Sequence, residues 1–143
     1  MAQELSPRLR AVVDALPLRE GMRVLEIGCG PGAAAREVAH RVGDGHVLAI
    51  DRSAKAIALA IAGSQAEVTA GRLSFSCVAV EDFELSSGEP QFDLAFAVRV
   101  GALDGRHPEI GRKALLHVAR ALTATGCLLV DRADCMVEVP LQR

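Results

Sequence analysis

The sequence predicts a doubly wound α/β fold, in which a mainly parallel sheet carries helices on both faces. Short apolar runs typical of strands alternate with helical segments along the chain. These runs are apolar at consecutive positions, as expected for strands that are buried on both faces. A glycine-rich turn directly follows the first run. We therefore expect a single domain over residues 1–143, with five strands in the order 3-2-1-4-5.

A leading helix and a first strand-helix unit open the chain. Ser6 and Pro7 are typical of a helix start, and apolar residues at helical spacing continue to about Leu16. Arg23 to Ile27 is a compact apolar run, which predicts the first strand. The alanine-rich segment Ala33 to Val42 favours a helix after the glycine turn.

A second unit repeats this pattern and leads to the third strand. Val47 to Ile50 predicts a strand, and Ser53 is a suitable N-cap for a helix over Ala54 to Ile61. Leu73 to Val80 predicts the third strand. The acidic segment Glu81 to Gln91 contains a Gly-Glu-Pro breaker, so we expect a crossover that is mostly loop.

The last two predicted strands flank a long helix. Phe92 to Val100 is almost wholly apolar and predicts the fourth strand. Glu109 to Thr123 has the apolar spacing of a helix, and Gly126 is expected to close it. Cys127 to Val130 then predicts a short fifth strand.

Composition and charge limit the classes of function. Half of the residues are apolar, and the net charge of −2 arises from interspersed acidic and basic residues, so a disordered chain and a nucleic-acid partner are both disfavoured. Cys29, Cys77, Cys127 and Cys135 are widely separated and lack metal-ligand spacing, so we expect reduced thiols and no metal site. Neither a signal peptide nor a run of about 18 apolar residues is present, which predicts a cytoplasmic protein without a membrane partner.

The glycine turn and one downstream acid predict a nucleotide-like ligand. Gly28, Gly30 and Gly32 would let the backbone approach a ligand closely, because they have no Cβ. Asp51 ends the second strand, 23 residues after Gly28. Its carboxylate could accept hydrogen bonds from both hydroxyl groups of a ribose.

These features alone also fit a nicotinamide dinucleotide. Gly28, Gly30 and Ala33 satisfy the G-x-G-x-x-A pattern of such sites. Glu26, inside the strand two residues before the first glycine, favours a different ligand. A pyrophosphate would bring negative charge close to this acid, whereas a cationic ligand would be attracted to it.

The segment from Val24 to Gly32, with Asp51 downstream, closely resembles the first two motifs of class I S-adenosylmethionine (SAM)-dependent methyltransferases. The resemblance covers residues ~17 to 132, with decreasing specificity. It implies SAM as cofactor. It also implies that the acid at Glu26 helps to hold the methionine amino group, that the turn including Cys29 lies under the cofactor, and that Asp51 binds the ribose.

The resemblance suggests further cofactor contacts with less specificity. By position, Arg52 and Val98 could touch the cofactor. Many family members carry Gly-Asp after the third strand to meet the adenine amino group, whereas this chain has Val78-Ala79. Glu81 or Asp82 is the expected substitute.

The chain departs from the family pattern at its C-terminal end. The family fold continues beyond the fifth strand with a helix and an antiparallel pair of strands, whereas only Arg132 to Arg143 remains here. We therefore expect that a full C-terminal β-hairpin is lacking. Cys135 to Val139 could form one short edge strand, which Pro140 would end.

The predicted function is methyl transfer from SAM to a small molecule or a protein. The alternatives are a non-catalytic SAM-binding module completed by a partner chain and an NAD(P)-dependent oxidoreductase. No catalytic residue is assigned, although Arg99 could engage an anionic substrate or pair with Asp104 or Glu109. His107 could accept a proton from a substrate, but an exposed loop histidine explains it better. A sheet edge left open near the fifth strand suggests a homodimer.

Overall fold

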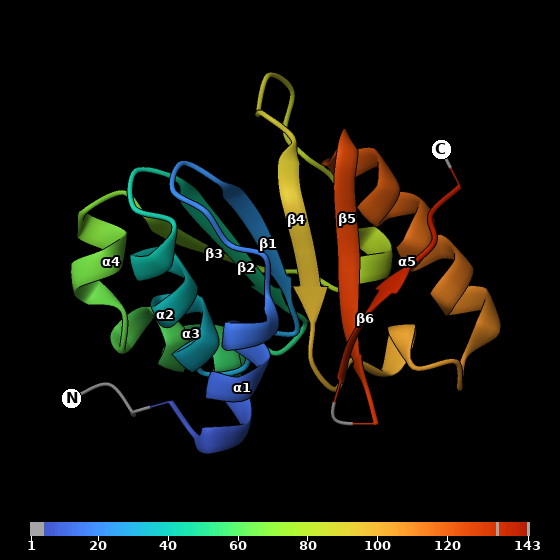
Figure 1. The fold of residues 1–143 in the computed structure, drawn as a ribbon, viewed down its shortest axis with the longest axis horizontal. Helices are drawn as coiled ribbons and strands as arrows, with labels where there is room; N and C mark the ends of the chain where they lie inside the picture. Colours follow the sequence, from blue (N-terminus) through green and yellow to red (C-terminus); the bar gives the residue numbers. More distant parts are fainter. Residues whose placement is uncertain (1–4, 134, 143) are drawn as a thin grey trace.

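The computed structural model of the chain describes residues 5–133 and 135–142, and helices and strands alternate along most of it (Figure 1). The elements are α1 (Pro7–Ala15), β1 (Arg23–Ile27), α2 (Ala33–Arg41), β2 (His46–Asp51), α3 (Ala54–Ala62), α4 (Gln65–Thr69), β3 (Leu73–Cys77), η1 (Val80–Asp82), β4 (Phe92–Ala97), η2 (Gly101–Leu103), α5 (Pro108–Ala121), β5 (Leu122–Arg132) and β6 (Cys135–Val139). The short helix α4 and the two 3₁₀ turns are absent from the sequence prediction.

The sheet has six strands in the order β3-β2-β1-β4-β5-β6. The prediction of a five-stranded sheet that lacks a full C-terminal hairpin is therefore wrong, although the short edge strand over Cys135 to Val139 is confirmed. Strands β1 to β5 pair in parallel, and β6 pairs antiparallel to β5, from Leu128↔Val139 to Arg132↔Cys135. The reversal needs only a tight turn, which includes Ala133 at a φ of 47°. The return strand consequently needs only the five residues Cys135–Val139.

Strand β5 is much longer than its apolar run predicts, because it begins directly where α5 ends at Ala121. Gly126, which we expected to close the helix, instead lies within this strand. The pairing of β4 with β5 shifts register between Phe92 and Leu94, and a Cβ on Gly126 would lie 3.0 Å from the Phe92 carbonyl oxygen. The glycine is therefore needed for close approach of two strands at an irregularity in the pairing.

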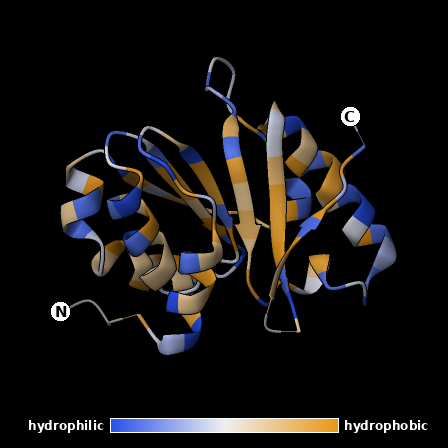
Figure 2. Ribbon diagram, in the orientation of Figure 1, coloured by the Kyte–Doolittle hydropathy of each residue, from blue (hydrophilic) through white to orange (hydrophobic). Residues whose placement is uncertain are grey.

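Most strands contribute alternate side chains to two separate cores, whereas the edge strand β3 contributes Leu73 and Phe75 to one of them. Val24 and Leu94 lie in the core under α1, α2 and α3, whereas Leu25 and Ala95 lie in the core under α5. The strands consequently carry apolar residues on both faces, and orange and tan predominate along β4 and the lower part of β5 in Figure 2, with one blue band across β4. This arrangement leaves the carboxyl ends of the parallel strands as the edge at which loops can form a site.

Candidate cofactor site

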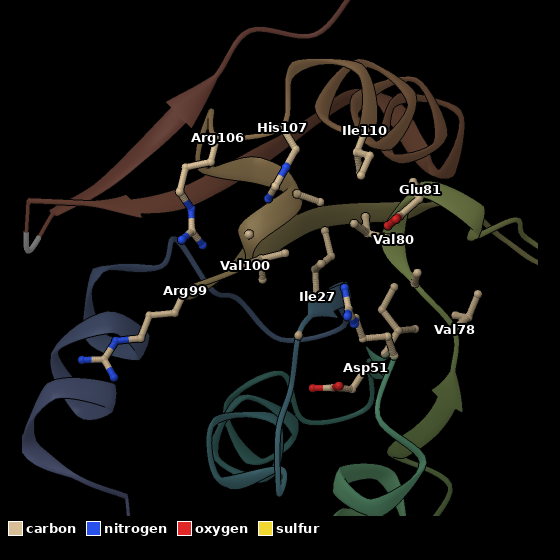
Figure 3. A pocket seen from close by; sticks show the side chains of 16 residues that line it. Ile27, Asp51, Val78, Val80, Glu81, Arg99, Val100, Arg106, His107 and Ile110 are labelled. Atoms are coloured by element: carbon tan, nitrogen blue, oxygen red, sulfur yellow. The ribbon is translucent and has the colours of Figure 1, made fainter.

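A cavity of about 520 Å³ lies at the carboxyl ends of β1, β2 and β4, where the strand order reverses (Figure 3). This is the position at which open α/β sheets bind ligands. The residues that line it come from the ends of the strands and from the loops after β3 and β4: Ile27, Gly28, Ile50, Asp51, Arg52, Val78, Ala79, Val80, Glu81, Arg99, Val100, Gly101, Ala102, Arg106, His107 and Ile110.

The glycine turn is held tightly against β2. The backbone N–H groups of Gly28 and Cys29 both donate to the Ile50 carbonyl oxygen, at 2.8 and 3.0 Å. Gly28 has a φ of 71°, and a Cβ built on it would lie 2.6 Å from Cγ2 of Val100. Gly30 has a φ of 54°, and nothing lies within 4 Å of its ideal Cβ position. The turn therefore needs glycine for its backbone shape, and at Gly30 it leaves open space.

The turn and Asp51 are directly connected. The Gly30 N–H donates to Oδ2 of Asp51 at 2.9 Å, and the Ser53 N–H donates to Oδ1 at 2.9 Å. These bonds fix the orientation of the carboxylate at the cavity wall, while each oxygen keeps a further lone pair. Asp51 can therefore accept hydrogen bonds from two hydroxyl groups of a ligand without giving up its backbone partners.

Glu26 is a buried acid with an unsatisfied oxygen. Its side chain is only 3% exposed, and Oε1 has no hydrogen-bond partner within the described residues. Burial, and to a lesser extent the negative charge of Asp51, raise the pKa of Glu26 to about 8, against a smaller opposing effect of Arg36. An unpaired buried carboxyl is costly, so its retention beside a glycine turn fits a ligand that brings a positive charge or a donor.

Arg36 supports the turn from below, a role that the sequence analysis missed. Its Nη1 donates to the Pro31 carbonyl oxygen and to Oγ of Ser64, both at 3.0 Å. Arg36 is 8% exposed and Ser64 is fully buried. An arginine in an alanine-rich helix has the ordinary pattern of a solvated residue, so no sequence signal could have identified this contact.

The other predicted cofactor contacts separate into two groups. Arg52 and Glu81 line the cavity. Asp82 is not among the lining residues and instead forms an exposed ion pair with Lys113 at 2.8 Å. Val98 packs against the core under α1 to α3. Each of the four assignments remains a prediction, but the geometry favours Glu81 over Asp82 for an adenine contact.

Cys29 behaves as a packing residue inside the turn. Its side chain is 7% exposed, and Sγ lies 3.5 Å from the Gly30 carbonyl oxygen. Burial and the nearby negative charges raise the pKa of the thiol well above its ordinary value. A thiol that stays protonated is a poor nucleophile, so the structure offers Cys29 no catalytic role.

The loop after β4 brings basic groups to the opposite wall of the cavity. Arg99, Arg106 and His107 all line it, and Figure 3 shows the His107 ring directed inward. The predicted pairing of Arg99 with Asp104 is not observed, because Asp104 pairs with Arg106 at 2.6 Å. Sequence analysis did not select Arg106, whose position depends on the turn at η2.

The described residues lack the features of two other classes of protein. None of the helices over 5–133 and 135–142 combines the length and apolar character needed to cross a membrane. No group of three or more His, Cys, Asp or Glu side chains suited to a metal ion is found in those same ranges.

Comparisons with known proteins agree with this geometry. Residues 24–126 match the family described as "Methyltransferase domain". A trans-aconitate 2-methyltransferase from Methylobacterium nodulans is 31% identical over 136 residues, which cover 92% of this chain and 47% of that protein. The chain thus spans about half the length of the curated relatives it matches.

Solved structures share the fold. The [4+2]-cyclase SpnF is 28% identical with a TM-score of 0.65, over 85% of this chain and 42% of that one. A SAM-dependent methyltransferase from Thiobacillus denitrificans, solved with S-adenosylhomocysteine, is 23% identical with a TM-score of 0.67, over 91% of this chain and 50% of that one. The second likeness concerns the fold alone.

The family match covers more than half of the chain and includes the glycine turn, Asp51 and most of the sheet. It also removes the nicotinamide-dependent alternative, which the glycine pattern alone had left open. The chain belongs to the class I SAM-dependent methyltransferase family.

Proposed function

We propose that this chain binds SAM in the cavity at the ends of β1, β2 and β4 and transfers its methyl group to a small molecule. The observation that carries the proposal is the unsatisfied Oε1 of the buried Glu26, beside a glycine turn that is hydrogen-bonded to Asp51. An acid in this position suits the ammonium group of an amino-acid moiety. Asp51, at the end of the neighbouring strand β2, suits the ribose of the same ligand.

Each of three acids has a separate task in this proposal: Asp51 and Glu81 line the cavity, whereas Glu26 is buried and is not among the lining residues. Glu26 holds the amino group, Asp51 accepts from the ribose hydroxyl groups, and Glu81 is placed to accept from the adenine amino group. Bound SAM supplies an electrophilic methyl group, so the protein's main contribution is to align the acceptor. Alignment can account for ~7 to 11 kcal/mol of a barrier, and a strong catalytic acid is therefore not required.

A small-molecule acceptor is favoured over a protein. The related trans-aconitate enzyme is named for a small acid, and a second relative, from Aspergillus nomiae, is named as an O-methyltransferase. The cavity of about 520 Å³ lies in the range of small-ligand sites and is the size of a cofactor site, so the choice of acceptor rests on these relatives.

Titration calorimetry with SAM, S-adenosylhomocysteine and NAD tests the cofactor. We expect binding of the first two and none of NAD, with affinity lowered at least tenfold in Glu26→Gln and Asp51→Asn. Arg72→Gln, at the amino end of β3 on the opposite edge of the sheet, is the matched control. Failure of the wild-type chain to bind either SAM or S-adenosylhomocysteine would contradict the proposal.

A second candidate is a SAM-binding domain that does not transfer the methyl group. It is favoured by the likeness to a [4+2]-cyclase at 28% identity, because a shared fold does not imply a shared reaction. A methyl-release assay against a panel of small acids, amines and phenols distinguishes the two. Turnover of any of them decides for methyl transfer.

We also propose a homodimer, formed along the open side of β6. Val137 on this edge strand is 38% exposed, and unpaired strand edges are commonly covered. Gel filtration at two protein concentrations tests this, since a monomer at both would contradict it.

A further inference from the structure

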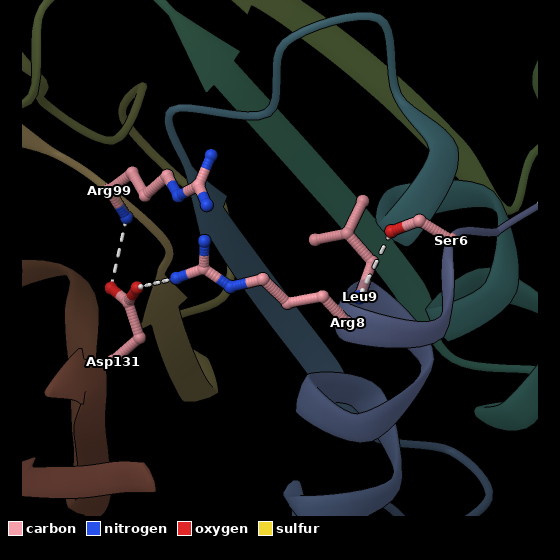
Figure 4. A network of polar contacts seen from close by, with 5 residues as sticks. All are labelled: Ser6, Arg8, Leu9, Arg99 and Asp131. Atoms are coloured by element: carbon pink, nitrogen blue, oxygen red, sulfur yellow. Dashed lines mark hydrogen bonds and ion pairs between the residues drawn. The ribbon is translucent and has the colours of Figure 1, made fainter. Parts of the chain in front are cut away.

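A cluster of charged residues lies at the carboxyl ends of β4 and β5, beside the cavity but outside its cofactor wall (Figure 4). Asp131, near the end of β5, accepts from the backbone N–H of Arg99 at 2.9 Å through Oδ1. Its Oδ2 accepts from Nη2 of Arg8 on α1 at 3.1 Å. One carboxylate therefore joins three elements that are distant in the sequence: α1, the loop after β4, and β5.

This cluster has one more positive charge than negative charge. Asp131 neutralises Arg8, but the Arg99 side chain has no ion pair with any residue in 5–133 or 135–142. Figure 3 shows that side chain extending toward α1, and Figure 4 shows its guanidinium group beside that of Arg8. Two neighbouring guanidinium groups repel each other unless an anion lies between them.

The backbone at Arg99 is strained in a way that directs this side chain. Its φ is 57°, in the left-handed region that glycine adopts readily and a residue with a long side chain does not. The hydrogen bond to Asp131 holds the conformation. Strain of this kind is found at ligand sites, where the surrounding structure maintains it. Arg99 is exposed, so this conformation presents its guanidinium group where a ligand can reach it.

Arg99 also lies between two open spaces. It lines the cofactor cavity and a second cavity of about 270 Å³ at the ends of β4 and β5, which Asp131 and Arg132 line as well. If Asp51 and Glu81 hold the adenosine at the ends of β2 and β3, the acceptor must approach from the β4 and β5 side. Arg99 is then placed between the cofactor and the incoming acceptor.

We propose that Arg8 and Arg99 bind an oxyanion group, carboxylate or phosphate, of the methyl acceptor. This inference rests on the proposed methyltransferase function and assigns the acceptor to the class of small acids. A guanidinium fork forms paired hydrogen bonds with two oxygens of either group, which fixes the orientation of the acceptor as well as its position. Asp131 would act as a positioning residue that holds both arginines at the site.

The experiment is calorimetric titration of the chain, alone and saturated with S-adenosylhomocysteine, with tricarballylate as the carboxylate probe and glycerol 3-phosphate as the phosphate probe. We expect one probe to bind, with affinity that falls as salt rises. Arg99→Gln and Arg8→Gln should each weaken it by about tenfold, the loss expected for a charge-assisted hydrogen bond at an accessible site. Arg72→Gln, which removes the same charge from the opposite edge of the sheet, should change it little.

A further variant separates binding from folding. Arg99→Gly removes the side chain but suits the positive φ, so it should melt no lower than wild type and still lose the probe. Binding of neither probe, or an equal loss in Arg72→Gln, would overturn the inference. If S-adenosylhomocysteine binds while both probes fail, only the acceptor class is wrong. If S-adenosylhomocysteine itself does not bind, the proposed function is wrong.

Discussion

Replacing Glu26 by glutamine should make the empty protein more stable and the cofactor bind more weakly. The carboxyl is 3% exposed, and burial raises its pKa from 4.5 to about 8. In the unfolded chain the group is ionised at neutral pH, so folding must either protonate it or bury its charge. Glutamine has almost the same shape and removes this cost. The cost is largest at pH values at which the carboxyl of the unfolded chain is ionised.

The expected gain in the free energy of unfolding therefore increases with pH. Because the folded pKa is raised, wild-type stability contributed by this group is complete below 4.5 and falls as the pH rises toward 8. At about 1.4 kcal/mol per pH unit, Glu26→Gln should gain less than about 1 kcal/mol at pH 5, about 3 at pH 7 and about 5 at pH 9.

Urea denaturation of both proteins at these three pH values measures the gain. Glu20→Gln is the control, because this glutamate is exposed and its neutralisation should have little effect at any pH. A difference between wild type and Glu26→Gln that does not change with pH would refute the reasoning, even if the variant were more stable. The same variant should bind S-adenosylhomocysteine at least tenfold more weakly, because glutamine cannot ionise to a carboxylate when the ammonium group of the ligand approaches.

Three further variants test the supports of the site. Gly28→Ala should lower the free energy of unfolding by about 1 to 3 kcal/mol in a urea titration, since its Cβ would lie 2.6 Å from Cγ2 of Val100 at a φ of 71°. Adding Val100→Ala should recover part of this loss. If it recovers none, the steric explanation is excluded. Asp51→Ala should weaken S-adenosylhomocysteine at least tenfold by calorimetry, and unchanged affinity would argue against a ribose contact. Arg36→Met should lower the melting temperature, because the Pro31 carbonyl and the buried Ser64 hydroxyl lose their hydrogen-bond donor. An unchanged melting temperature would show that water replaces the guanidinium group as donor.

The sequence is informative about the site wherever function depends on residues close in the chain or on the ends of predicted strands. Gly28, Gly30 and Gly32 follow a strand directly, and all three have positive φ values. Asp51 ends the neighbouring strand, and the ends of adjacent parallel strands lie at the same edge of a sheet. The hydrogen bond from Gly30 to Asp51 follows from that placement.

Residues whose role depends on distant packing could not be identified in this way. Arg36 reaches Ser64 and Pro31 only because α2 crosses behind the turn and α4 begins at that point. Arg99 joins Asp131, 32 residues away, and Asp131 also meets Arg8. Long flexible cations give no periodic signal, since solvated and buried arginines have the same pattern in sequence.

The sequence by itself determined the alternation of strands and helices, the ligand edge of the sheet and the glycine turn, because these depend on local hydrophobic pattern and on backbone freedom at glycine. The length of β5 and its hairpin with β6 depend on tertiary packing. Gly126 resembles a helix stop, but its lack of a side chain is used for close contact with Phe92, which lets β5 run for eleven residues and pair with β6. Whether a glycine ends a helix or admits a neighbouring strand depends on what packs against it, and that is a property of the folded chain.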